Sequence, residues 1–495
     1  MNSRGMSRTR KAMEEYFDLL EEPLSKRAVR AVLEEGKKPT EVMKGMYRSD
    51  IMAAGQTLLG SMPYFWRYKD AGRAVADELK DLTMAKRALV AYYQGSVTPA
   101  EGPRFVRRAL LYADMVVMMD PVSRTALVRH IYSPKAAAEV AVWKALEVLK
   151  FRDLCLGAGG RGSPPLVILP PLDILMDEEE FEAIRRLADE HTLEASSEIF
   201  GRGFRSLKEL SEFIKSAQGP DKLAGRARRT ELLEFPDGGL DAIAHLRMFM
   251  EEELKLAPEG AFRGPDDPEL LKEAYLAVVR GCLCGVNEQF WFCGRFGAQP
   301  STDSEYHWRY LLWAYEHDQA RPARALLGEV HKGLRALSSR HARVLWLINR
   351  PEFRWLGDVP VKKLVKMREE GALEELRREL GRVFSVVGHL PLEELEEVVD
   401  DCRRELEDEL RRHEEKLRDL KMEFGLSASA VVVGVLGAAL PFLAPLAFLL
   451  GGSIGALPAL AAAKAGLDWW RERNRPIGIL LKPWRAHKAR EKGLR

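Results

Sequence analysis

Apolar side chains recur at intervals of three and four residues along most of this chain, the spacing that places them on one face of an α-helix. The pattern is clear over residues 70–93 and 136–150, and it returns over most of 175–350. Runs typical of strands are short and few. We therefore expect a mainly α protein: a multi-helical body with a few short strands, then a long amphipathic helix and a C-terminal apolar helical hairpin.

Three short apolar runs predict strands. Met115–Met119 is followed by Asp-Pro, which closes the run with a turn. Leu166–Leu169 lies between a Gly- and Pro-rich stretch and two further prolines, and residues 344–348 form the third run. No repeat of solenoid length accompanies them.

Residues 390–423 predict a long amphipathic helix with one narrow apolar seam. The stretch holds 14 acids and 7 bases, and His413 is the only polar residue in the seam. The apolar seam positions are Leu392, Leu395, Val399, Cys402, Leu406, Leu410, Leu417, Leu420 and Phe424. Two interpretations stay open: a helix packed on its own domain, and a coiled-coil stalk through which the chain self-associates.

Residues 424–463 contain no ionisable side chain. Pro441 and Pro445 divide them into two arms, each short for a full membrane crossing. A membrane hairpin, one kinked span and a hairpin buried in a soluble core all fit this length. The residues expected to meet lipid, ending in two tryptophans at the level of an interfacial belt, are Leu426, Val432, Leu436, Leu440, Phe442, Leu446, Phe448, Leu450, Trp469 and Trp470.

The tail, residues 464–495, carries 10 bases against 3 acids. Basic residues mixed with apolar ones suit an anionic cytoplasmic leaflet, so membrane lipid is the expected partner. A solvated tail is the alternative. The candidate lipid-binding residues are Arg471, Arg473, Arg475, Arg485, Lys488, Arg490 and Lys492.

These patterns divide the chain into six regions. They are an N-terminal helical region (1–150), a Gly/Pro-rich linker with a short strand (151–172), a central helical region (173–389), the charged amphipathic helix (390–423), the apolar segment (424–463) and the basic tail (464–495).

The composition bears on the size of the core, the cellular compartment and the source of the protein. A chain of 495 residues with 46% hydrophobic residues can bury a large core. Five cysteines make no even disulfide framework, and the first residues lack the apolar core of a signal peptide, which favours the cytoplasmic face of the inner membrane or, alternatively, the cytoplasm. The net charge of +2 argues neither for nor against nucleic acid, and no specific nucleic-acid partner is predicted. Only 4 Asn and 6 Gln occur, which fits a thermophilic or high-GC bacterial source.

Two stretches offer candidate chemistry. Cys282 and Cys284, with Cys293, are soft metal ligands, but their spacing is not that of a zinc knuckle and their apolar neighbours favour buried thiols. Asp303, Glu305 and His307 are candidate acid–base groups. Residues 301–304 are alternatively the cap of a helix.

No cofactor is expected from the motifs. The glycine-rich stretch at 157–162 matches a dinucleotide fingerprint in letters, but prolines and a strand follow it where the mechanism requires a helix. We interpret it as a loop.

Four fragments resemble a loose group of bacterial proteins that carry no assigned activity. The fragments are 110–114 with 120–121, 297–303, 359–361 with 367–368, and 473–476 with 480–481. The resemblance implies that the order of regions is a family plan, and it implies no site.

The sequence thus favours a cytoplasmic helical protein held at the inner membrane by its apolar segment and basic tail, acting as a scaffold or a membrane effector. The alternative is a soluble enzyme that uses the loop from Asp303 to His307 and buries the apolar hairpin as core.

Overall fold

The computed structural model describes residues 6–68, 71–84, 88–94, 102–127, 133–156, 164–228, 242–256, 259–319, 328–390, 394–423 and 475–493. The chain forms two compact units, residues 1–350 and 351–495. Both are built mostly of helices, which confirms the expected mainly α class with a few short strands. The first three predicted regions therefore belong largely to one unit.

The described part of the first unit contains one four-stranded sheet in which all strands are parallel. Its strands are β1 (Val90–Tyr93), β2 (Met115–Met119), β3 (Leu166–Leu169) and β4 (Gln299–Ser301). They lie in the order β3-β2-β1-β4. The chain steps outward from β1 to β3 and then crosses to the other side of β1, so the strand order reverses between β1 and β4.

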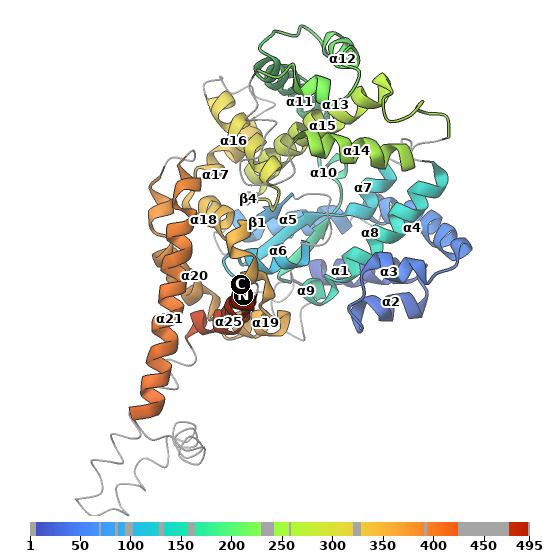
Figure 1. Cartoon of the computed structure of the whole chain (residues 1–495). Coiled ribbons are helices and arrows are strands. Elements are labelled where there is room, and N and C mark those ends of the chain that lie inside the picture. The colour runs from blue at the N-terminus through green and yellow to red at the C-terminus, as the bar shows by residue number, and fades with distance from the viewer. Residues whose placement is uncertain are drawn as a thin grey trace, which may run out of the picture. The chain divides into compact units, whose positions relative to one another are not determined.

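Helices surround this sheet (Figure 1). In chain order they are α1 (Met6–Glu21), α2 (Lys26–Leu33), α3 (Pro39–Lys44), α4 (Arg48–Tyr68), α5 (Ala71–Met84), α6 (Gly102–Ala109), α7 (Pro121–Leu127), α8 (Pro134–Leu149), α9 (Arg152–Leu156), α10 (Leu172–Leu175), α11 (Glu178–Phe200), α12 (Leu207–Lys215), α13 (Pro220–Ala224), α14 (Ala242–Leu256), α15 (Pro268–Phe296), α16 (Glu305–Gln319), α17 (Gly328–Leu337) and α18 (Arg340–Asn349).

Both faces of the sheet are covered, which explains why β1, β2 and β3 read as continuous apolar runs. Tyr92 stacks on Phe292 of α15, with ring centroids 4.1 Å apart. Tyr93, the next residue, stacks on Phe105 of α6 at 4.2 Å. Because successive strand residues point to opposite faces, α15 and α6 lie on opposite sides of β1.

Asp120, directly after β2, ties the sheet to three helices. Its buried carboxylate accepts hydrogen bonds from the Tyr16 hydroxyl of α1 (2.7 Å) and the Trp66 indole of α4 (2.9 Å). It also accepts from the Val122 backbone N–H (3.0 Å) and the Ser123 hydroxyl (2.5 Å) at the start of α7. Four donors satisfy this carboxylate, so we assign it a structural role.

Two of the three predicted strands, β2 and β3, are confirmed with their predicted bounds. The prediction of a strand at residues 344–348 is wrong, because they lie in α18. The Ser339 hydroxyl caps this helix by accepting from the Ala342 N–H at 3.1 Å. The run is buried on every side, and a helix buried all round has the same apolar pattern as a buried strand.

The second unit contains the 3₁₀ helices η3 (Pro351–Asp358), η4 (Val386–Gly388), η5 (Leu395–Val398) and η6 (Pro476–Leu480) and the α-helices α19 (Val361–Glu369), α20 (Leu373–Val383), α21 (Val399–Glu423) and α25 (Leu481–Gly493). The predicted seam is buried from Leu395 of η5 to His413 of α21, and α21 packs on η3, α20 and η6. This is the first of the two interpretations, a helix packed within its own unit. Self-association through 390–423 stays a prediction.

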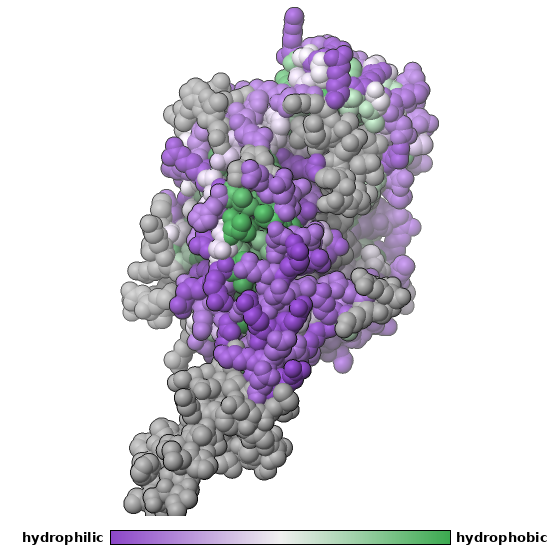
Figure 2. All heavy atoms as spheres, turned by 60° about the vertical axis from the view of Figure 1, so that its left-hand side comes forward, coloured by the Kyte–Doolittle hydropathy of each residue, from purple (hydrophilic) through white to green (hydrophobic). Residues whose placement is uncertain are grey.

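The described surface carries few large apolar side chains. Tyr47, Tyr64 and Val386 are the exposed ones among the described residues. The face drawn in Figure 2 is mostly hydrophilic, with a small apolar area. Within the described ranges, we find no helix with the length and hydropathy that a membrane crossing requires.

Candidate functional site

Open parallel sheets bind ligands beyond the carboxyl ends of their strands, where the strand order reverses. Here that place lies between β1 and β4. Gln94 follows β1, and its backbone N–H donates to the Ser301 carbonyl at the end of β4 (3.1 Å). Arg124 of α7 and Asp173 of α10 follow β2 and β3 at the same edge. The middle of α15 contributes the remaining side chains.

Gln94 lies against α15 because residue 285 is glycine. A Cβ on Gly285 would come within 2.5 Å of Gln94 Nε2. The Gln94 amide also hydrogen-bonds the carboxylate of Glu288, about one helical turn further along α15. Gln94 Oε1 is buried and has no hydrogen-bond partner among the described residues. The protein itself therefore leaves this acceptor unused within the described residues.

Glu288 is half-buried, and the Cys284 thiol donates to its Oε1 at 3.7 Å. Burial raises the pKa of Glu288; the Arg124 guanidinium acts against that rise and the Asp173 carboxylate adds to it. Burial also raises the pKa of Asp173, which pairs with Arg67 at 3.2 Å. This edge of the sheet therefore holds two carboxyl groups with raised pKa values, Glu288 and Asp173. The guanidinium groups of Arg124 and Arg67 lie near them.

The Tyr92 hydroxyl completes the site. It is buried and has no hydrogen-bond partner in the described structure. Burial raises its pKa, and the nearby carboxylate of Glu288 raises it further, so the hydroxyl stays protonated and can donate. We call Tyr92, Gln94, Arg124, Asp173 and Glu288 the carboxyl-edge site.

Gln289 holds β1 and β4 together next to this site. Its Nε2 donates to the carbonyls of Tyr92 (3.0 Å) and Ser301 (3.1 Å). Its Oε1 lies 2.9 Å from Nε2 of His307 on α16. The other imidazole nitrogen, Nδ1, lies 3.6 Å from the sulfur of Cys282.

The three candidate acid–base residues, Asp303, Glu305 and His307, do not face one another. Asp303 hydrogen-bonds the Tyr93 hydroxyl on the other face of the sheet, and Glu305 pairs with Arg350. His307 turns toward α15 instead. The Ser304 hydroxyl accepts from the His307 backbone N–H at 3.2 Å, so this stretch is the helix cap that the sequence offered as the alternative.

The three cysteines weighed as candidate metal ligands also lie apart from one another. Cys282 faces His307 and Cys284 faces Glu288, while Cys293 is buried with a pKa raised by that burial. All five cysteines of the chain lie in described segments and are free thiols. In those segments, no three His, Cys, Asp or Glu side chains gather to hold a metal ion.

Four of the basic residues predicted to meet lipid pair with acids of the second unit. Arg475 contacts Glu379 (2.6 Å) and Glu409 (3.2 Å). The other pairs are Arg485–Glu414 (2.6 Å), Lys488–Glu407 (3.0 Å) and Arg490–Asp358 (3.5 Å). Arg471, Arg473, the side chain of Lys492 and all the predicted lipid-facing residues from Leu426 to Trp470 lie outside the described residues. Lipid binding stays a prediction, and these ion pairs compete with it.

Sequence reasoning missed the members of the carboxyl-edge site. One signal in the sequence points to them: amide side chains are scarce, with 4 Asn and 6 Gln in 495 residues. Asn287, Gln289 and Gln299 nevertheless fall within a short stretch, and Gln94 lies opposite them in space. Two of these rare amides, Asn287 and Gln289, lie in the apolar helix α15, which indicates a local requirement for hydrogen bonding.

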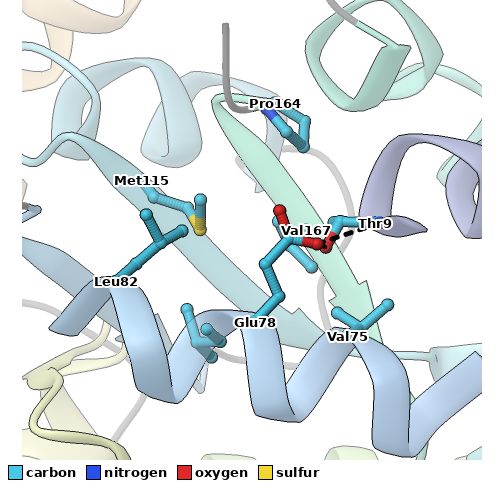
Figure 3. Close-up of a pocket in the computed structure, with 8 residues that line it drawn as sticks. Thr9, Val75, Glu78, Leu82, Met115, Pro164 and Val167 are labelled. Carbon is cyan, nitrogen blue, oxygen red and sulfur yellow. Dashed lines mark hydrogen bonds between the residues drawn. The ribbon is translucent and has the colours of Figure 1, made fainter. Parts of the chain in front are cut away.

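A separate small cavity lies near the amino ends of β2 and β3 (Figure 3). Glu78 of α5 points toward Thr9 of α1, and the Thr9 backbone N–H donates to the Glu78 carboxylate at 3.1 Å. Met115 and Pro164 also line the cavity. Its volume is about 10 Å³, which is about the space that one water molecule needs. Its polar groups satisfy each other, so we do not assign it a ligand.

No protein-family model, curated protein or solved structure matches the chain.

Proposed function

We propose that the first unit is an enzyme that binds a small, hydroxyl-bearing anionic molecule at the carboxyl-edge site, with Glu288 as its acid–base group. The observation that carries this proposal is a pair of buried polar atoms beside Glu288, Tyr92 Oη and Gln94 Oε1, that have no partner in the described structure. Buried polar atoms are nearly always hydrogen-bonded. A donor and an acceptor left unmatched where parallel sheets bind ligands favour a ligand site over a packing defect.

The chemistry of the side chains sets the class of ligand. Glu288 and Gln94 accept hydrogen bonds from hydroxyl groups, and Tyr92 donates one. Arg124 is exposed, and its guanidinium suits a phosphate or carboxylate group. Because burial raises the pKa of Glu288, this carboxyl can exchange a proton with a bound hydroxyl closer to neutral pH than an ordinary glutamate. A phosphorylated sugar or a nucleotide fits these requirements.

Calorimetric titration with ribose 5-phosphate, ADP and unphosphorylated ribose tests the proposal. We expect a phosphorylated ligand to bind and ribose to bind more weakly. Arg124→Ala should weaken binding about tenfold or more, because a hydrogen bond to a charged group contributes about 1.5–3 kcal/mol. Glu288→Gln should abolish any turnover of the bound ligand, because a glutamine amide cannot exchange a proton with the ligand's hydroxyl group.

Matched controls are Arg73→Ala and Glu179→Gln, which change exposed residues on α5 and α11. Both should bind as the parent does. Absence of binding by every phosphorylated ligand, or equal binding by Arg124→Ala and Arg73→Ala, would contradict the proposal.

We propose second that the chain associates with the cytoplasmic face of the inner membrane through residues 424–463, as a scaffold or effector. The apolar sequence supports this, and the described ends of the segment favour a hairpin over one crossing. α21 ends at Glu423 and η6 begins at Pro476, and Arg475 pairs with Glu409 of α21. The chain therefore leaves and re-enters the same unit. Recovery of the whole protein in the soluble fraction at low salt without detergent would reject membrane association and favour the apolar hairpin as core.

A further inference from the structure

The helix α25 of the second unit has one face that is basic and exposed to solvent. From Leu481 to Glu491 its exposed residues are Lys482, Arg485, Ala486, Ala489 and Arg490. At 100° per residue these five positions fall within about 140° of the helix circumference. We call this surface the α25 basic face. It holds three cations and no acid, and because alanine side chains are short, a broad anionic surface can contact all three cations.

The opposite side of the same segment is fixed to the second unit. Arg475 pairs with Glu379 (2.6 Å) and Glu409 (3.2 Å), and Glu379 also accepts the Ile477 N–H (3.1 Å). The two glutamate side chains are 13% and 12% exposed, and breaking a largely buried ion pair destabilises a protein strongly. The apolar side chains buried here are Ile477, Leu480, Leu481 and Trp484. The helix therefore stays docked while its basic face meets solvent.

The two arginines of the basic face are held much more weakly. Arg485 pairs with Glu414 of α21 (2.6 Å), and Arg490 pairs with Asp358 of η3 (3.5 Å). Their side chains are 57% and 64% exposed. Exposed ion pairs contribute little to stability and are screened by salt. The phosphate groups of another surface can therefore replace Glu414 and Asp358 as partners of the arginines without displacing the helix.

We propose that the α25 basic face docks on anionic lipid headgroups, and that Glu414 and Asp358 weaken this docking by competing for its arginines. The inference goes beyond the proposed association through residues 424–463, because it uses other residues and an electrostatic force. Lipid is favoured over nucleic acid because the apolar segment 424–463, which has no ionisable side chain, precedes this helix in the chain. A basic surface next to an apolar segment suits an anionic leaflet.

The test is co-sedimentation of the full chain with vesicles of phosphatidylcholine alone and of phosphatidylcholine mixed with phosphatidylglycerol. We expect tighter binding to the mixed vesicles, by a margin that shrinks as salt is added. A basic residue near an anionic surface contributes about 1 kcal/mol. The triple variant Lys482→Gln, Arg485→Gln, Arg490→Gln should therefore bind the mixed vesicles about 10²-fold more weakly than the parent.

A second triple variant controls for net charge. Arg404→Gln, Arg411→Gln, Arg418→Gln removes three exposed cations from α21. It carries the same net charge as the first variant and leaves the α25 basic face intact. Its loss of affinity for the mixed vesicles should be less than about tenfold.

The competing acids give a prediction of opposite sign. Glu414→Gln releases Arg485, so binding to mixed vesicles should strengthen about fivefold. Glu415→Gln makes the same change of charge at the next residue of α21, which is exposed, and should strengthen binding much less. If Glu414 only stabilised the fold, Glu414→Gln would leave binding unchanged or weaken it. Thermal melting of both variants should show no gain in stability.

Labelling of Lys482 reports on the face itself, even if residues 424–463 enter both kinds of vesicle. Lys482 is exposed, so acetic anhydride should acetylate it in the free protein, as measured by peptide mass spectrometry. Mixed vesicles should protect it, and phosphatidylcholine vesicles should not.

Equal losses of affinity in the two triple variants, or equal labelling of Lys482 with both kinds of vesicle, would overturn the proposal. Tight binding of a single-stranded oligonucleotide that only the α25 triple variant loses, without a preference for mixed vesicles, would assign the face to nucleic acid instead. Binding to phosphatidylcholine alone measures the apolar segment. Failure of the basic face and failure of association through 424–463 are therefore distinguishable.

Discussion

At the scale of single residues, Gly285 decides whether Gln94 can reach Glu288. In Gly285→Ala the new Cβ would meet Gln94 Nε2 at 2.5 Å. The end of a flexible side chain can move away, and alanine favours the helix by about 1 kcal/mol, so we expect the fold to persist. Ligand binding at the carboxyl-edge site should weaken about tenfold, because the displaced Gln94 side chain can no longer hydrogen-bond Glu288 or the ligand.

Calorimetric titration and thermal melting measure both effects. Gly281→Ala is the control, since its Cβ would have no heavy atom within 4 Å one turn earlier on α15. Weaker binding in both variants, or in neither, would show that Gln94 does not depend on this glycine.

His307 makes stability depend on pH in a direction that follows from its burial. Its pKa is about 3 in the folded protein, against 6.5 for an ordinary histidine. Between these values the unfolded chain binds a proton that the folded protein does not, so the free energy of unfolding falls as the pH falls through that window. The loss attributable to His307 should reach up to about 1.4 kcal/mol per pH unit.

Urea unfolding of the parent and of His307→Gln at steps between about pH 7 and about pH 4 checks this prediction. The difference between the two curves isolates His307 from Glu288, whose raised pKa acts in the opposite sense. Parallel curves would mean that the imidazole gains its proton as easily in the folded protein as in the unfolded chain.

At the scale of elements, α15 and α17 cross with their backbones in contact. A Cβ on Gly294 of α15 would lie 1.8 Å from the Glu329 carbonyl oxygen, and one on Gly333 of α17 would lie 1.8 Å from that of Phe290. Backbone cannot move aside as a side-chain tip can. Gly294→Ala should therefore lower the free energy of unfolding by about 3 kcal/mol or more, measured by urea denaturation.

Gly328→Ala is the matched control for that crossing, because a Cβ at this first residue of α17 would meet nothing within 4 Å. It should change stability by less than about 1 kcal/mol. Equal stability of Gly294→Ala and Gly328→Ala would show that the two helices have room to separate.

The elements also show where periodicity misleads. β1 lies inside residues 70–93, whose apolar spacing predicts a helix, yet the run ends as a strand between β2 and β4. β4 has three residues and contains Pro300. Such a short segment shows no alternation of apolar and polar residues from which a strand could be predicted. Both strands form because their neighbours supply the hydrogen bonds, a condition that no local window of sequence contains.

At the scale of the whole molecule, the first unit holds the entire described sheet and its covering helices. We expect a chain that ends at Arg350 to fold on its own, with cooperative urea unfolding and helical circular dichroism. A chain that ends at Leu337 lacks α18, which packs on β4 and α6, and should be much less stable. Loss of cooperative unfolding in the longer chain would show that the first unit requires the second.

Some features followed from the sequence because the forces behind them are local. The helical class, β2 and β3, the buried seam of α21 and the Ser304 cap depend on spacing and side-chain type within a few residues. The carboxyl-edge site did not follow, because Gln94 comes from the end of β1 and Arg124, Asp173 and Glu288 come from three helices, and only the parallel crossovers bring these segments together. Their protonation was also decided by the tertiary structure, since burial sets the pKa values of Glu288 and His307, and burial is a property of the packed chain.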